Sequence, residues 1–155
     1  MMNTEKVFGK PIEILLVEDS SGDARLAMEV FKESKIRNNL HWTEDGVEAL
    51  AFLRKEDKYA QALRPDLILL DLNLPRKNGL EVLADIKEDK NFKRIPVVIL
   101  TVSKAERDII KSYNLHANCY IVKPIDFQQF NDVVKSIEDF WLTIAKLPPD
   151  EEIIV

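Results

Sequence analysis

Short apolar runs of strand length alternate five times with longer segments of helical periodicity along this chain of 155 residues. Most of the short runs are nearly continuous in Ile, Leu and Val, which is typical of strands buried on both faces. The expected strands are Ile12–Glu18, the region of His41–Thr43, Asp66–Asp71, Pro96–Thr101 and Cys119–Val122. The expected helices are Ala24–Lys35, Val47–Lys55, Leu80–Lys87, Lys104–Asn114 and Phe127–Ala145. This alternation predicts a doubly wound α/β domain with a five-stranded parallel sheet and helices on both faces.

Residues that favour helix N-termini stand where the expected helices begin. Ser20 or Ser21 precedes the first helix, Asn78 and Gly79 precede the third, and Asp126 opens the last. These residues support the order of elements that the apolar pattern predicts.

Composition excludes several classes of protein. A single Cys excludes a disulfide framework or a Cys-based zinc cluster and fits a reducing cytoplasm. The net charge of −5 argues against nucleic-acid binding, which usually needs a basic face. The apolar runs are far shorter than the roughly 18 residues of a membrane helix, and the N-terminus has no signal-peptide pattern. We therefore expect a water-soluble cytoplasmic protein with no nucleic-acid partner and no membrane segment.

Polar residues end most of the expected strands. The first ends in Glu18 and Asp19, the third in Asp71, the fourth in Thr101, and the fifth is followed by Lys123 and then Pro124. In a doubly wound sheet, ligands bind at the carboxyl ends of the strands. Three carboxylates, a hydroxyl and an ammonium would thus meet at one edge of the sheet.

This set of side chains matches phosphoryl-transfer chemistry. Clustered carboxylates repel one another unless a cation neutralises them, and Mg²⁺ prefers oxygen ligands and a phosphate partner. One further carboxylate, Asp71, can then act as a nucleophile toward phosphorus. Lys123 and Thr101 can hold the oxygens of the transferring group. Each of these residues alone could be a helix cap; all of them together, at successive strand ends, favour a site.

Four segments of the sequence carry a resemblance to a known family. They are ILLVEDS (14–20), RPDLILLDLNLPRKNG (64–79), VVILTVS (97–103) and ANCYIVKP (117–124). In order and spacing they resemble the receiver domain of two-component response regulators, over about residues 12–140. The resemblance implies a flavodoxin-like fold and a phosphorylation switch.

The resemblance implies roles for the acidic residues. Asp71 would accept a phosphoryl group from a phosphohistidine on a sensor histidine kinase. Glu18 and Asp19 match the acidic pair of the metal site, with Asp19 the more direct ligand to Mg²⁺ (or Mn²⁺). The backbone carbonyl of Asn73 matches the third protein ligand. Many members have Asp at the position of Glu18, so we expect this longer side chain to act through water.

The resemblance also implies the residues that respond to the phosphate. Thr101 matches the switch hydroxyl, Lys123 the phosphate-binding lysine, and Tyr120 the aromatic residue that changes rotamer with the threonine. Pro124 stands where the family usually has a cis peptide. Val102 follows Thr101 where a smaller residue is frequent, which would restrict how Tyr120 packs.

The C-terminal segment is longer than the common pattern, so we expect a receiver over residues 10–147 and a tail over 148–155. The last expected helix has a broad apolar stripe, formed by Phe127, Phe130, Val133, Val134, Ile137, Phe140, Trp141, Ile144 and Leu147. Such a band favours a homodimer contact through Phe140 and Trp141. Alternatively, one of these two side chains folds back onto the tail.

The segments LNLPRKNG and SYNLHANCYIVKP, with the FWL tail, look like single-domain receivers paired with bacterial, especially cyanobacterial, phytochrome kinases. Members of that group are often dimers through the same face, and a phytochrome is the implied kinase. Arg76 and Lys77 could contact a kinase helix or could be surface charge. His41 and His116 are expected to be structural, and Trp42 to pack in the core or at its rim.

Three functions remain open. The first is a phosphorylation switch that takes part in its own modification, is not otherwise an enzyme, and needs no small-molecule substrate beyond a phosphodonor. The second is a phosphorylation-independent interaction scaffold. The third is an Asp-nucleophile phosphohydrolase, which would normally have a second acid where this chain has Asn73. The intact acidic set favours the first.

Overall fold

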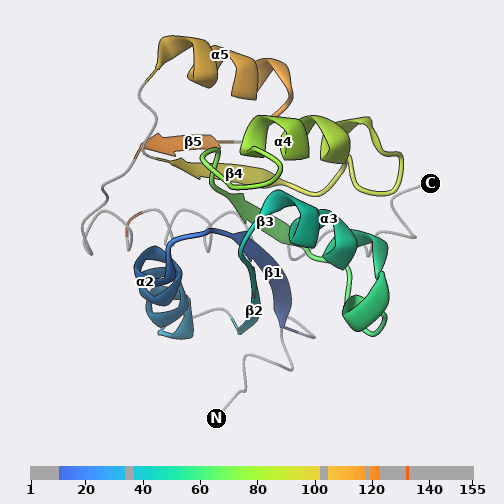
Figure 1. The fold of residues 1–155 in the computed structure, drawn as a ribbon. Helices are drawn as coiled ribbons and strands as arrows, with labels where there is room; N and C mark the ends of the chain where they lie inside the picture. Colours follow the sequence, from blue (N-terminus) through green and yellow to red (C-terminus); the bar gives the residue numbers. More distant parts are fainter. Residues whose placement is uncertain (1–10, 34–36, 102–104, 118, 123–131, 133–155) are drawn as a thin grey trace, which may run out of the picture.

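A five-stranded parallel sheet forms the centre of the molecule in the computed structural model (Figure 1). The structure describes residues 11–33, 37–101, 105–117, 119–122 and 132. The strands are β1 (Ile12–Val17), β2 (Asn38–Thr43), β3 (Leu67–Leu70), β4 (Val97–Thr101) and β5 (Cys119–Val122). Their order in the sheet is β2-β1-β3-β4-β5, with all neighbouring pairs parallel. The predicted doubly wound α/β fold is confirmed.

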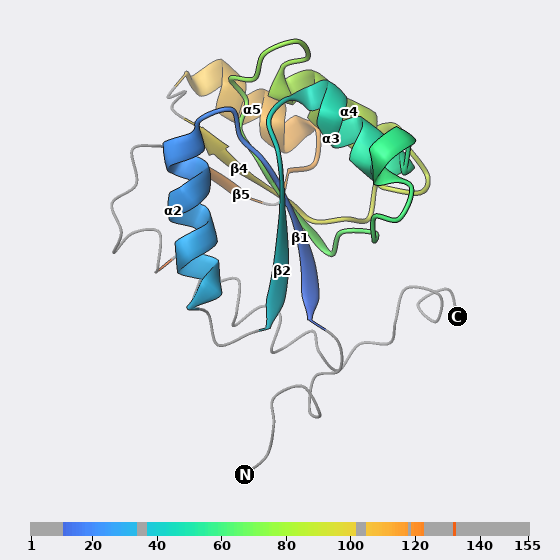
Figure 2. The same cartoon turned by 60° about the horizontal axis from the view of Figure 1, so that its bottom comes forward.

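Helices cover the two faces of this sheet. The elements are α2 (Ser21–Lys32), α3 (Gly46–Arg54), the short 3-10 helix η1 (Asp57–Tyr59), α4 (Gly79–Glu88) and α5 (Glu106–Asn114). Helix α2 lies on one face, whereas α3 and α4 lie on the other, as the turned view of Figure 2 also shows. Among the described helices, none is long and apolar enough to cross a membrane.

Alternate residues of the strands point to two separate layers of the core. Ile14 and Leu16 of β1 pack with Val30 and Phe31 of α2. Leu15 of β1 belongs to the other layer, with residues of α3 and α4. Because the central strands are buried on both faces, they need the nearly continuous apolar runs seen in the sequence. The layers hold the strand ends, and thus the polar residues that follow them, in a fixed arrangement.

The second strand differs from its prediction. It covers six residues, Asn38–Thr43, rather than a short strand around His41. This strand lies at the edge of the sheet and pairs with β1 alone, so polar side chains are tolerated in it. Asn39 and His41 both bond the carboxylate of Glu13, each at 2.8 Å. The expectation that His41 is structural agrees with this contact.

Helix starts follow the capping pattern, with small shifts. Ser20 caps α2 by accepting a hydrogen bond from the Asp23 N–H, so the helix begins three residues before the expected start. It also ends three residues before the expected end. Asn78 caps α4 as predicted, in a reciprocal pair with Glu81. Asp45 caps α3, a contact that the sequence-based prediction does not include.

Several sequence-based predictions lie outside the described residues. They are the predictions for Val102, Lys123 and Pro124, for the C-terminal helix with Phe140 and Trp141, and for the tail over residues 148–155.

Candidate functional site

Three carboxylates meet at the carboxyl ends of β1 and β3. One oxygen from each of Glu18, Asp19 and Asp71 lies within 4.8 Å of the others. Glu18 and Asp71 are buried, with 3% and 6% of their surface exposed, and Asp19 is exposed. The predicted gathering of these strand-end acids is confirmed. Hard oxygen ligands at this separation fit a divalent cation such as Mg²⁺, which would also relieve their mutual repulsion.

The backbone of Glu18 is held by the edge strand. Its N–H donates to the carbonyl of Thr43 at 3.0 Å, and its carbonyl accepts a 2.6 Å hydrogen bond from the indole Nε1 of Trp42. The Glu18 carboxylate accepts from the Ser20 N–H at 3.1 Å. Trp42 therefore does more than pack in the core or at its rim, as its sequence context predicts: it also orients the first acidic residue.

Asp71 is fixed at the end of the central strand. Its N–H donates to the Val17 carbonyl at 3.0 Å, and its carboxylate accepts from the Asn73 N–H at 2.9 Å. Gly79, the first residue of α4, packs against this backbone. A Cβ there would lie 2.3 Å from the Asp71 carbonyl oxygen, so no other residue fits without a shift.

Thr101 and Asn73 form a second part of the site. Thr101 ends β4 and is fully buried. Its Oγ1 accepts a 3.1 Å hydrogen bond from the side-chain amide of Asn73. Tyr120 of β5 lies opposite Ile99 of β4 in the register and packs against the core layer of α3 and α4. The sequence predicts a role only for the carbonyl of Asn73, and nothing in its pattern indicates that the side chain reaches β4.

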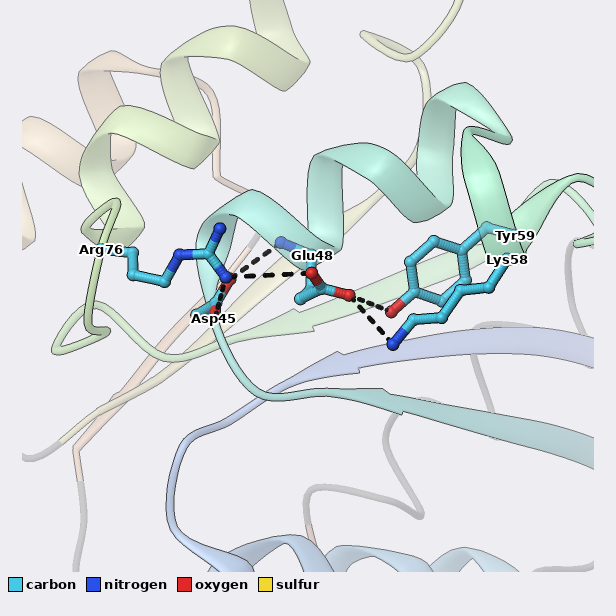
Figure 3. A network of polar contacts seen from close by, with 5 residues as sticks. All are labelled: Asp45, Glu48, Lys58, Tyr59 and Arg76. Atoms are coloured by element: carbon cyan, nitrogen blue, oxygen red, sulfur yellow. Dashed lines mark hydrogen bonds and ion pairs between the residues drawn. The ribbon is translucent and has the colours of Figure 1, made fainter.

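A polar network links the loop after Asp71 to the start of α3 (Figure 3). Arg76 Nη1 lies 3.1 Å from Asp45 Oδ2 and 3.8 Å from Glu48 Oε2. On the other side of Glu48, Tyr59 donates a 2.6 Å hydrogen bond and Lys58 forms an ion pair at 3.4 Å. The sequence allows Arg76 to be a kinase contact or a surface charge. The network gives Arg76 intramolecular partners, Asp45 and Glu48, which neither alternative includes.

The network changes the titration of two of its members. The hydrogen bond from Tyr59 is the main cause that lowers the pKa of Glu48, with the charges of Lys58 and Arg76 as smaller causes. Burial, and then the bond to Glu48, raises the pKa of Tyr59. The phenol is thus held as a neutral donor. A signal for part of this network was in the sequence, since Asp45 and Glu48 have the spacing of an N-cap and its N3 residue.

The chain matches the family model described as response regulator receiver domain over residues 14–135. It is 51% identical over 138 residues to response regulator Rcp1 of Synechocystis, covering 89% of this chain and 94% of that protein. It is also 31% identical over 120 residues to the chemotaxis protein CheY-3 of Vibrio cholerae, covering 77% of this chain and 86% of that protein.

Solved structures give the same result. The phosphorylated cyanobacterial phytochrome response regulator RcpA is 52% identical with a TM-score of 0.81, covering 90% of this chain and 99% of that one. The Mn²⁺-bound form of Rcp1 is 51% identical with a TM-score of 0.80, covering 89% of this chain and 99% of that one. The chain therefore belongs to the response regulator receiver family.

Proposed function

We propose that Asp71 accepts the phosphoryl group in this response regulator and that, together with Glu18, Asp19 and the carbonyl of Asn73, it forms the metal site. The observation that carries this proposal is the meeting of three carboxylate oxygens within 4.8 Å at the ends of β1 and β3. Two of these acids are buried, where neighbouring like charges destabilise the fold, and such groups are typical of functional sites.

In the reaction, an Asp71 carboxylate oxygen attacks phosphorus. A bond from phosphorus to that oxygen forms, while the bond to the donor nitrogen of a kinase histidine breaks and its electron pair stays on the imidazole. The Asn73 N–H holds the carboxylate in place. Thr101, and Lys123 beyond the described residues, would bind the phosphoryl oxygens, and Tyr120 would repack with Thr101. A bound divalent cation supplies charge neutralisation during this transfer.

Mg²⁺ is the proposed cofactor, with Mn²⁺ as an alternative. The donor set consists only of oxygens, which both ions accept. The relative Rcp1 is described in a Mn²⁺-bound form, which supports extending the same site to this chain.

The proposed partner is a sensor histidine kinase of the phytochrome type. The support is the description of RcpA as a phytochrome response regulator, together with its 52% identity to this chain. We further propose a homodimer through the apolar stripe of residues 127–147, with Phe140 and Trp141 at its centre. Light scattering of Phe140→Ala should then show monomers where the unmodified protein shows dimers.

Intact-mass spectrometry after incubation with Mg²⁺ and a small acyl phosphate tests the phosphoacceptor. The unmodified chain should gain one phosphoryl group, and Asp71→Asn should gain none. Asp66→Asn is the matched control: Asp66 lies at the other end of β3 and accepts a hydrogen bond from the Glu13 N–H, which an Asn oxygen can still accept. This control should be phosphorylated like the unmodified protein.

Two outcomes would contradict the proposal. Phosphorylation that survives Asp71→Asn would assign the acceptor elsewhere. No phosphorylation of a folded protein, by the acyl phosphate or by a phytochrome kinase, would favour the scaffold function. The phosphohydrolase alternative gains no support from the site, because the amide of Asn73 has no acidic proton to give to a leaving group.

A further inference from the structure

We propose that Arg76 is a positioning residue for the metal site: its ion pair with Asp45 holds the loop between β3 and α4 so that the Asn73 carbonyl faces the cation. This inference rests on the proposed function, since it concerns how the same site is kept in shape. The loop comprises residues 71–78 and carries Asp71 and Asn73 at its start.

The backbone at Arg76 is strained. Its φ is +64°, and the Lys77 N–H donates to the Pro75 carbonyl at 2.7 Å, which closes a three-residue turn around Arg76. Turns of this kind with positive φ are rare and strained, and bulky side chains disfavour the left-handed region. Such a conformation persists only where surrounding contacts impose it.

The side chain of Arg76 supplies one of these contacts. It pairs with Asp45 at 3.1 Å, and the Asp45 side chain is only 11% exposed. The other oxygen of Asp45 accepts from the Glu48 N–H at 2.8 Å and so caps α3. Asp45 is therefore fixed by the helix, and it offers the half-exposed guanidinium of Arg76 a partner in a set position. An ion pair to such an anchored carboxylate is better defined than an ordinary surface pair.

The backbones of the loop and of α3 also touch beside this pair. A Cβ at Gly46 would lie 2.4 Å from the Lys77 carbonyl oxygen. The loop is thus held against the N-terminus of α3 by backbone contact and by the Arg76–Asp45 pair, which lies at the left of Figure 3. At its other end, the Asn73 N–H is bound to the Asp71 carboxylate. Only Leu74 and Pro75 separate Asn73 from the strained residue, so a shift at Arg76 is transmitted to the Asn73 carbonyl.

Lys77 provides a matched control. It carries the same charge in the same loop, but its Nζ pairs with Asp85 of α4 at 2.8 Å rather than with α3. Neutralising Arg76 or Lys77 removes one positive charge. By electrostatics alone, either change would strengthen binding of a dication. Loss of the Arg76 contact with α3 predicts the opposite, weaker binding, and only for Arg76.

The test is a titration with Mn²⁺, followed by the loss of the free-ion signal in electron paramagnetic resonance. Arg76→Gln should raise the Kd about 3- to 10-fold, less than the roughly 10- to 100-fold loss that follows removal of direct partners of metal ligands, because Arg76 acts on Asn73 through the loop. Lys77→Gln should leave the Kd within about twofold. Asp45→Asn should match Arg76→Gln, because Asn still caps the helix, and the double variant should show no further loss.

Two further variants distinguish the effect of the Arg76 ion pair from the effect of its strained backbone. Arg76→Gly relieves the strained φ and should still weaken Mn²⁺ binding, whereas Arg76→Lys should restore part of the affinity. The rate of phosphorylation by an acyl phosphate should return to the unmodified value when Mg²⁺ saturates Arg76→Gln. It should stay low in Asp19→Asn.

Equal Kd values for Arg76→Gln and Lys77→Gln would overturn the inference and leave the proposed function intact. If urea titration of Arg76→Gln shows no cooperative unfolding, the Asp45→Asn variant tests the inference instead. An unchanged Kd for Mn²⁺ in Asp45→Asn then overturns the inference. If the unmodified protein binds no Mn²⁺ and Asp19→Asn behaves identically, the proposed function fails and the inference fails with it.

Discussion

The side-chain amide of Asn73 donates a 3.1 Å hydrogen bond to the hydroxyl of Thr101, and so connects the loop after β3 to the end of β4. Thr101 is fully buried, and its hydroxyl accepts this bond at the edge of the acidic site. Because the oxygen of Thr101 serves as acceptor for Asn73, the bond directs the hydroxyl proton away from the amide. Asn73 therefore restricts the orientations open to a side chain that the proposed switch requires to move.

A double-mutant cycle of Asn73→Ala and Thr101→Val should show coupling in the free energy of unfolding. We expect about 1 kcal/mol, the usual value of a neutral hydrogen bond. The measurement is urea unfolding of all four proteins without divalent cations. Additive single effects would contradict the coupling.

Much of the fold follows from the sequence because the buried strands need continuous apolar runs. The acids at the ends of β1 and β3 are predicted to meet because parallel strands in one sheet bring their carboxyl ends to one edge. The sequence therefore predicts the grouping of Glu18, Asp19 and Asp71 that the structure shows. The edge strand β2 is longer than the apolar pattern predicts, because its polar residues Asn39 and His41 both bond the carboxylate of Glu13 on the neighbouring strand β1.

The contacts that refine the site could not be predicted in this way. The bond between Asn73 and Thr101 depends on a side-chain direction in a loop, and the pair of Arg76 with Asp45 depends on how that loop approaches α3. Neither has a periodic signature, and their partners are separated by about 30 residues. The strained φ of Arg76 is likewise set by tertiary contacts and not by local preference.

Without metal, Asp71→Asn should stabilise the protein by about 1 kcal/mol, because it removes one of three neighbouring negative charges. Asn still offers an oxygen to the Asn73 N–H, so that hydrogen bond is kept. Addition of Mg²⁺ at roughly 100 times its Kd should stabilise the unmodified protein by about 2.7 kcal/mol. The variant should gain much less. Thermal unfolding with and without Mg²⁺ measures both effects.

Asp66→Asn serves as the comparison, since it removes a carboxylate at the opposite end of β3. Its response to Mg²⁺ should equal that of the unmodified protein. An Asp71→Asn protein that is less stable without metal would show that the acidic cluster carries no net repulsion in the folded state.

Tyr59→Phe should raise the pKa of Glu48 toward its ordinary value. The Tyr59 hydrogen bond is the largest cause that lowers this pKa, and the charge of Arg76 is a smaller one. The bond stabilises the fold above the ordinary pKa of Glu48, and this contribution is lost as the pH falls through the lowered value. NMR titration of the Glu48 carboxyl should show a larger rise of its pKa in Tyr59→Phe than in Arg76→Gln. The reverse order would assign the effect to charge rather than to the hydrogen bond.

Two glycines at helix starts should respond oppositely to alanine. Gly22 lies in α2, and a Cβ there would meet no atom closer than Ser20 Oγ at 3.9 Å. Gly22→Ala should therefore stabilise the protein by roughly 0.5 kcal/mol through helix propensity. At Gly79, a Cβ would meet the Asp71 carbonyl oxygen at 2.3 Å and the Leu72 Cα at 2.4 Å.

Because both contacts at Gly79 are with backbone, relief requires α4 or the loop to move away from Asp71. We expect Gly79→Ala to destabilise the protein by about 2 kcal/mol or more and to weaken Mn²⁺ binding, while Gly22→Ala leaves the Kd unchanged. Urea unfolding and Mn²⁺ titration of the two variants provide the measurement. If Gly79→Ala lost stability but kept its Mn²⁺ affinity, the metal site would be insensitive to the loop after β3. The close packing of Gly79 would then serve only the fold.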